Sequence, residues 1–103
     1  MIEVTILIPL ASNEGDTFSP AHHATFEALL IESFGGFTRL PGNASGGWVD
    51  GGITYRDSNM VYMVLVPGLI GKCFQLTRVI AFAKRHYRQL AVTVRYLGVA
   101  EII

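Results

Sequence analysis

The segment "NMVYMVLVP", residues 59–67, is apolar on both faces of the strand that it predicts. Successive side chains point to opposite faces. Val61, Met63 and Leu65 lie on one face, and Tyr62, Val64 and Val66 lie on the other. A strand that is apolar on both faces belongs inside a sheet, with something covering each face. The segment therefore predicts a central strand.

The segments around it predict a βαββαβ order in a single domain, residues 1–103. "IEVTILIPL", residues 2–10, is a second strand with an apolar face and a half-polar face. One helix is expected from Ser19, a good N-cap before Pro20, to the pair Gly35-Gly36. A second helix covers residues 71–89 and a last strand residues 91–96. This order predicts a ferredoxin-like α+β sandwich, an antiparallel sheet with its first and third strands central and both helices on one face.

The glycine-rich stretch, residues 34–55, has neither the GxxxxGK[ST] pattern nor a GxGxxG turn of a nucleotide site. Asp50-Gly51, followed by Gly52, is a strong hairpin signal between residues 46–49 and 53–57. Gly46 and Gly47 are expected to bend the strand that precedes this turn. The stretch predicts an irregular hairpin without a phosphate site.

Two helices cover only one face of such a sheet. The other face is expected to carry Thr5, Leu7, Tyr62, Val64, Thr93 and Arg95, or the complementary sets. Half of the residues are hydrophobic and 16% are charged, which is a low charged fraction for a small monomer. The composition therefore predicts a homodimer, with a higher oligomer left open.

A cleft between the hairpin and the sheet is the expected binding site. Its predicted ligand-binding residues are Trp48, Tyr55, Tyr62 and Arg95, which would bind a small ligand or a protein partner. The alternative is a small cofactor-independent enzyme of the dimeric α+β barrel type at the same cleft. No catalytic residue is assigned, and whether the chain is an enzyme stays open.

Arg78, Arg85 and Arg88 form a predicted basic patch on the second helix. Nucleic-acid binding through this patch is a further alternative. Eight basic residues balance eight acidic ones, and this argues against it because non-specific binding draws on an excess of basic charge.

No metal or cofactor is expected. His22 and His23 are adjacent on a helix and project about 100° apart, so they cannot chelate one ion together, and His86 is the third candidate. Cys73 cannot form an internal disulfide and is expected to pack on its helix. With no leader pattern and no apolar span, the sequence predicts a cytoplasmic protein without a membrane segment.

The patterns "FGGFTRLPG", "GGW", "VYMVLVP" and "RHYRQLAVTVRY" resemble those of small bacterial and mobile-element proteins. The resemblance covers residues 26–96. It implies a ferredoxin-like α+β fold and brings no activity and no catalytic residue with it.

Overall fold

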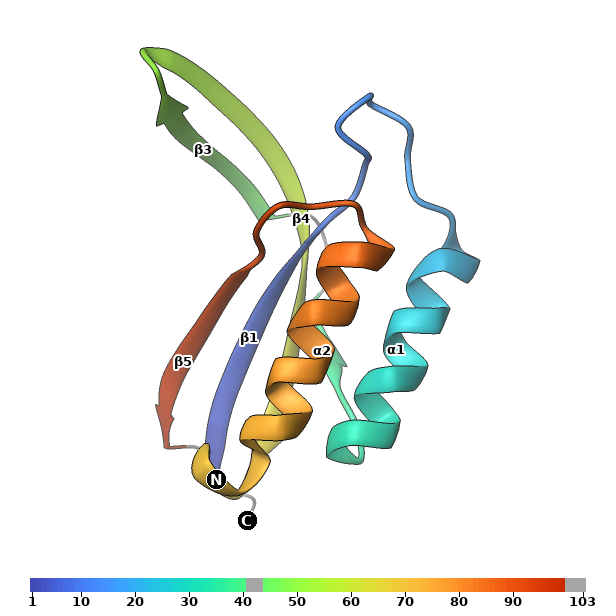
Figure 1. The fold of residues 1–103 in the computed structure, drawn as a ribbon, viewed down its shortest axis with the longest axis vertical. Helices are drawn as coiled ribbons and strands as arrows, with labels where there is room; N and C mark the ends of the chain where they lie inside the picture. Colours follow the sequence, from blue (N-terminus) through green and yellow to red (C-terminus); the bar gives the residue numbers. More distant parts are fainter. Residues whose placement is uncertain (41–43, 100–103) are drawn as a thin grey trace.

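The computed structural model describes residues 1–40 and 44–99. The elements are, in chain order, β1 (Ile2–Pro9), α1 (Pro20–Phe34), β2 (Thr38–Arg39), β3 (Ala44–Asp50), β4 (Ile53–Val66), the 3-10 helix η1 (Ile70–Lys72), α2 (Cys73–His86) and β5 (Thr93–Val99). The antiparallel sheet has the order β2-β4-β1-β5, β3 pairs with β4, and both helices lie on one face (Figure 1). The predicted ferredoxin-like fold is confirmed, with β1 and β4 as its central strands.

Helix α1 begins and ends at the predicted residues. The Ser19 hydroxyl accepts a hydrogen bond from the backbone N–H of His22 at 3.1 Å, and Pro20 follows as the first helical residue. Gly35 ends the helix at φ 80° and donates its N–H to the carbonyl of Ile31 at 2.8 Å. Glycine adopts this left-handed conformation at little cost, which explains the end of the helix here.

The register between β1 and β4 decides which side chains face the helices. Ile6 lies opposite Tyr62 and Val4 opposite Val64, and residues directly opposite each other share a face. All four belong to the core beneath the helices. Of the two alternatives that the sequence leaves open for β4, the one that places Tyr62 and Val64 on the uncovered face is wrong, since Tyr62 is 0% exposed in the core. Because both faces of β4 are apolar, alternation alone could not choose between them.

No described element covers the opposite side of the sheet, which we call the open face. Its members are Glu3, Thr5, Leu7, Val61, Met63, Leu65, Thr93 and Arg95. The apolar members Leu7, Val61, Met63 and Leu65 are each half-buried. The open face is thus apolar along β4 and mixed along β1 and β5.

Strand β4 is one strand of 14 residues, where the sequence predicts two separate strands. Its second half pairs with β1, whose last partner is Asn59, while Ile53–Ser58 pairs only with β3 among the described strands. Residues 44–58 therefore form a two-stranded ribbon that extends beyond the two-layer body, and we call it the arm (Figure 1).

The arm turns at the predicted glycine pair. Gly51 and Gly52 have φ angles of 58° and 79°, as a two-residue hairpin turn with two left-handed positions requires. β3 pairs with β4 from Ala44 to Asp50 without a shift in register, so no β-bulge lies at Gly46 and Gly47.

Helix α2 differs from expectation at one side chain, Cys73, and its two phenylalanines, Phe74 and Phe82, differ in exposure. Phe82 stacks on Phe26 and on His86, with ring centroids 6.4 Å and 4.8 Å apart. Phe74 is 85% exposed. Cys73, expected to be packed, is also exposed.

Candidate functional site

The structure does not bring the four predicted ligand-binding residues together. Tyr62 lies in the core and presents no exposed surface to a ligand. Tyr55 is in the arm, 41% exposed, and its backbone pairs with that of Trp48, whose side chain lies outside the described part of the structure. Arg95 is exposed on β5, opposite Thr5 and on the far side of β1 from β4.

Tyr62 instead belongs to a polar cluster that the sequence analysis missed. Its hydroxyl donates to Oε2 of Glu27 at 2.6 Å, and Nη1 of Arg39 donates to the same oxygen at 2.9 Å. Burial raises the pKa of the Tyr62 hydroxyl well above its usual range, and the hydrogen bond to Glu27 acts in the same direction. The cluster joins α1, β2 and β4, and its neutral tyrosine and paired carboxylate fit a structural role.

All three histidines of the chain meet at one end of the helix pair. Nδ1 of His23 lies 2.8 Å from the Tyr87 hydroxyl, and both side chains are buried. Burial lowers the pKa of the His23 ring, partly opposed by the Glu27 carboxylate. His22 and His86 stack with ring centroids 3.6 Å apart.

One ring nitrogen of each histidine is hydrogen-bonded to a protein group. Nε2 of His22 and Nε2 of His86 each lie 2.7 Å from a main-chain oxygen, while His23 bonds Tyr87. No group of three or more His, Cys, Asp or Glu side chains within residues 1–40 and 44–99 could hold a metal ion. The sequence signal for this cluster was the histidines themselves, but their pairing across 64 residues required the fold.

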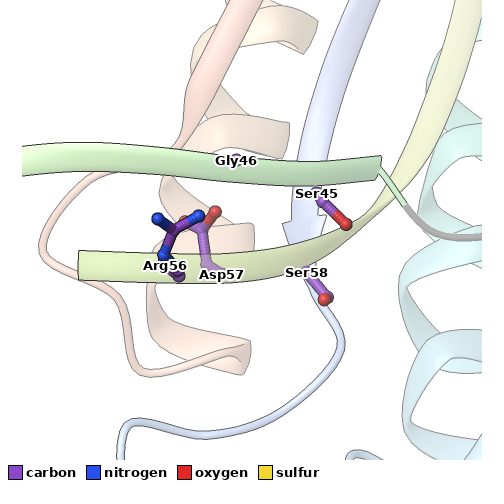
Figure 2. A pocket seen from close by; sticks show the side chains of 5 residues that line it. All are labelled: Ser45, Gly46, Arg56, Asp57 and Ser58. Atoms are coloured by element: carbon purple, nitrogen blue, oxygen red, sulfur yellow. The ribbon is translucent and has the colours of Figure 1, made fainter. Parts of the chain in front are cut away.

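The stem of the arm holds an open depression of about 320 Å³. It is lined by Ser45, Gly46, Arg56, Asp57 and Ser58 (Figure 2). Asp57 lies opposite Gly46, and its side chain reaches toward the β3 backbone there. A Cβ at position 46 would come within 2.8 Å of Oδ1 of Asp57, so glycine leaves space for this carboxylate.

The lining combines a guanidinium, a carboxylate and two hydroxyl groups. It therefore offers hydrogen-bond donors and acceptors to a small polar molecule. A second depression, of about 280 Å³, lies beside the end of α1 and is more apolar, with Phe37, Met63 and Leu65 in its wall.

The predicted basic patch is partly paired. Nη2 of Arg78 bonds Oε1 of Glu32 at 3.3 Å. Arg85 is exposed in the last turn of α2, and Arg88 is exposed just after it, with a φ of 53°. Helix C-termini favour such basic side chains, which gives the patch a structural explanation.

None of the helices in the described part of the chain has the length and apolar character needed to cross a membrane.

Known proteins with a similar structure share the fold of this chain, but none assigns it to a family. No protein-family model matches this chain, and no curated protein matches it. Among solved structures, it is similar to the divalent cation tolerance protein (Cut A1) from Thermus thermophilus, with a TM-score of 0.65 and 14% identity over 99% of this chain and 86% of that one. It is also similar to the PII-like protein CutA from Nostoc sp. PCC 7120 in apo form, with a TM-score of 0.64 and 13% identity over 96% and 81%.

A phage SAM lyase in complex with S-methyl-5'-thioadenosine has a TM-score of 0.61 and 10% identity, over 90% of this chain and 77% of that one. At such identities the likeness concerns the backbone alone. The chain thus shares the ferredoxin-like α+β fold of CutA and PII-like proteins.

Proposed function

We propose that this chain is a self-associating cytoplasmic domain, in which a second copy covers the arm, and that a small polar ligand binds at the stem of the arm. The observation that carries the proposal is the exposure of the arm. Every described side chain from Ser45 to Ser58 is exposed, including Val49 at 66% and Ile53 at 57%. An isolated two-stranded hairpin is only marginally stable in water, and it gains stability from a further strand or from packing against another element. A partner that covers the arm supplies such a contact.

The same chain offers two surfaces for the arm of another copy. One is the open face, where Leu7 and Met63 are half-buried with no described element above them. The other is a strand edge. Since β1 ends at Pro9, β4 continues beyond it, and β3 is the described strand that pairs with residues 53–58. Another strand can add along the edge of a sheet. Because both surfaces belong to this chain, a second copy is the favoured partner.

Light scattering on the full chain at micromolar concentration tests self-association. We expect the wild type to be a dimer or a higher oligomer. The double variant Val49→Asp/Ile53→Asp should shift toward monomer, because it buries carboxylates in the contact. Ile70→Asp is the matched control, since Ile70 is 92% exposed on η1, outside the arm. A monomeric wild type, or loss of the oligomer in the Ile70 variant alone, contradicts the proposal.

The depression at the stem supports the ligand part of the proposal. Arg56 and Asp57 present opposite charges beside two serine hydroxyls, which suits a ligand that carries both donors and acceptors. The phage SAM lyase of the same fold holds S-methyl-5'-thioadenosine, a molecule of this kind. A small cofactor-independent enzyme at the same place is the second candidate, and binding of such a ligand is its first requirement.

Calorimetric titration with S-methyl-5'-thioadenosine, adenosine and a divalent cation as separate probes tests this part. We expect the wild type to bind at least one probe with a measurable heat. Asp57→Asn should weaken this binding by about tenfold or more, which corresponds to a loss of about 1.4 kcal/mol in binding free energy. Asp16→Asn is the control, because Asp16 is exposed in the loop before α1. If no probe binds, or if both variants bind like the wild type, the depression is not a site for these ligands. Self-association is measured separately and does not depend on this result.

A further inference from the structure

Helices α1 and α2 pack against the sheet with one side and leave the opposite side in solvent (Figure 1). On α2, Leu76, Val79 and Ala83 are the buried side chains. A helix has about 3.6 residues per turn, so the positions turned furthest from these three form a line along the helix. This line consists of Phe74, Arg78, Ala81 and Arg85.

Apolar side chains with very high exposure lie at both ends of α2. Ile70, on η1, is 92% exposed, Phe74 is 85% exposed, and Leu90, just after α2, is 98% exposed. No other large hydrophobic side chain in the described part of the chain exceeds the 66% of Val49. Single exposed apolar side chains are common, but their concentration on one segment marks a contact surface.

The charges of the same segment are all basic. Residues 70–99 hold six of the eight basic residues and no acidic residue. Arg78 is paired with Glu32 of α1. Lys84, Arg85 and Arg88 are exposed, and no ion pair within residues 1–40 and 44–99 involves them. The outer side of α2 therefore combines apolar side chains with unpaired positive charge.

Helix α1 adds an uncharged surface beside α2. Its exposed positions on one side of the helix are Ala21, Ala24, Ala28 and Ile31. The 3.3 Å contact between Nη2 of Arg78 and Oε1 of Glu32 joins the two helices. Glu27, the other acidic residue of α1, is 19% exposed and already bonds Arg39 and Tyr62.

We call the outer side of both helices the helix-layer face. Its members are the two lines just described together with Ile70, Lys84 and Arg88. The acidic side chains of the loop before α1, Glu14 and Asp16, belong to neither line.

An anionic lipid surface suits this face better than a nucleic acid or a protein does. The interfacial region of a bilayer takes up apolar side chains, and its negative headgroups attract lysine and arginine. A nucleic acid would neutralise the basic side chains but would leave Ile31 and Ile70 in water, because bases stack on aromatic rings. Protein partners place anchor side chains in pockets, and neither of the two depressions described above is lined by a residue of α2.

We propose that the helix-layer face binds the surface of an anionic phospholipid membrane. Ile70 and Phe74 enter the interfacial region, and the basic side chains of α2 contact the headgroups. Such a contact needs no helix that crosses the bilayer. The face lies on the other side of the sheet from the open face and does not include the arm, so the proposal is independent of self-association.

Sedimentation of the full chain with vesicles tests the proposal. One set of vesicles contains phosphatidylcholine alone, and the other contains equal parts of phosphatidylcholine and phosphatidylglycerol. At about 0.1 M salt, we expect the partition coefficient to be about tenfold higher or more for the anionic vesicles. It should fall at about 0.5 M salt, because screening weakens the attraction. Equal binding to both sets, or no binding to either, overturns the proposal.

Phe74→Ser and Arg85→Gln separate the apolar contribution from the charged one. Each should lower the partition coefficient for anionic vesicles by about fivefold. The double variant should lower it by about twentyfold, because the two side chains contribute separately.

Leu40→Glu is the matched control for the double variant. It also removes an exposed apolar side chain and lowers the net charge by one unit, but it lies just after β2, outside the helix-layer face. It should bind the vesicles like the wild type. A loss in this control equal to that in the double variant, or a double variant that binds like the wild type, overturns the proposal.

Two further measurements identify other partners. If single-stranded RNA binds more tightly than anionic vesicles, and only Arg85→Gln weakens that binding, the face is a nucleic-acid surface. If light scattering shows that Phe74→Ser changes the oligomeric state, the face is a contact between copies. Either result overturns the proposal.

The single cysteine gives a direct view of the contact. Cys73 is exposed and directly precedes Phe74. A polarity-sensitive dye attached to Cys73 should shift its emission to shorter wavelength with anionic vesicles and not with phosphatidylcholine vesicles. The same dye attached to Leu40→Cys in a Cys73→Ser chain is the control and should show no shift. No shift at position 73, or a shift at position 40, overturns the proposal.

Discussion

The carboxylate of Asp57 occupies the space that any side chain at Gly46 would need, with Oδ1 only 2.8 Å from the position of a Cβ there. The two residues face each other across β3 and β4, so the glycine and the carboxylate act as a matched pair. At Gly47, the next residue, the nearest obstacle is the main-chain oxygen of Tyr55 at 3.6 Å, an ordinary contact.

The effect of alanine at position 46 on stability should depend on the side chain at position 57. Gly47→Ala should stabilise the chain by about 0.5–1 kcal/mol, the usual gain of alanine over glycine inside a strand. Gly46→Ala should give less than that, because Asp57 must move. In an Asp57→Ala background, Gly46→Ala and Gly47→Ala should change the free energy of unfolding by equal amounts. Urea unfolding at one fixed protein concentration measures the free energy of unfolding of each variant. The prediction is contradicted if the two alanine variants differ as much with Asp57→Ala as without it.

Removal of the Tyr62 hydroxyl should weaken the fold. Tyr62→Phe deletes the 2.6 Å hydrogen bond to Glu27 and is expected to cost about 1.5–3 kcal/mol in the free energy of unfolding, as for hydrogen bonds to charged groups. Tyr96→Phe, at an exposed position on β5, is the matched control and should stay within about 0.5 kcal/mol of the wild type. Equal effects of the two substitutions would show that the Glu27 contact does not stabilise the chain.

The two adjacent glycines at the end of α1 differ in backbone conformation, so alanine should have different effects at the two positions. Gly35→Ala should destabilise by about 1–2 kcal/mol, since Gly35 has a φ of 80° and a Cβ is strained there. Gly36→Ala should be neutral or slightly stabilising, because Gly36 is not left-handed and a Cβ would meet nothing within 4 Å. Thermal unfolding of the two variants measures the difference, and the reverse order would rule out the proposed helix end.

His23 should titrate below an ordinary histidine, because burial lowers its pKa. A lowered folded-state pKa means that the native state binds the proton less readily than the unfolded chain. Its contribution to stability is therefore complete above about pH 6.5 and is lost as the pH falls below that value. His23→Gln should flatten this part of the stability curve. Ring NMR provides the direct measurement, and a His23 pKa at or above about 6.5 contradicts the prediction.

The features that the sequence predicts correctly are local ones. The Ser19 cap, the Gly35 end and the Gly51-Gly52 turn each follow from the conformational preference of one or two residues. The central place of β1 and β4 follows from apolar side chains on both of their faces.

The features that it misses depend on register and on distant partners. Which face of β4 meets the helices is fixed by its pairing with β1, so the side of Tyr62 could not be chosen in advance. Its partner Glu27 lies 35 residues away on a helix. The pairing of Gly46 with Asp57, and the meeting of His22 with His86, likewise exist only once distant segments are aligned.

Strand β4 passes without a break from the arm into the core, so the arm and the centre of the sheet share one continuous backbone. A force applied at the Gly51-Gly52 tip travels along one continuous backbone to Asn59, where β1 begins to pair, and beyond it to Tyr62. A partner bound to the arm would therefore be connected to the centre of the sheet through a single strand, with no loop between them.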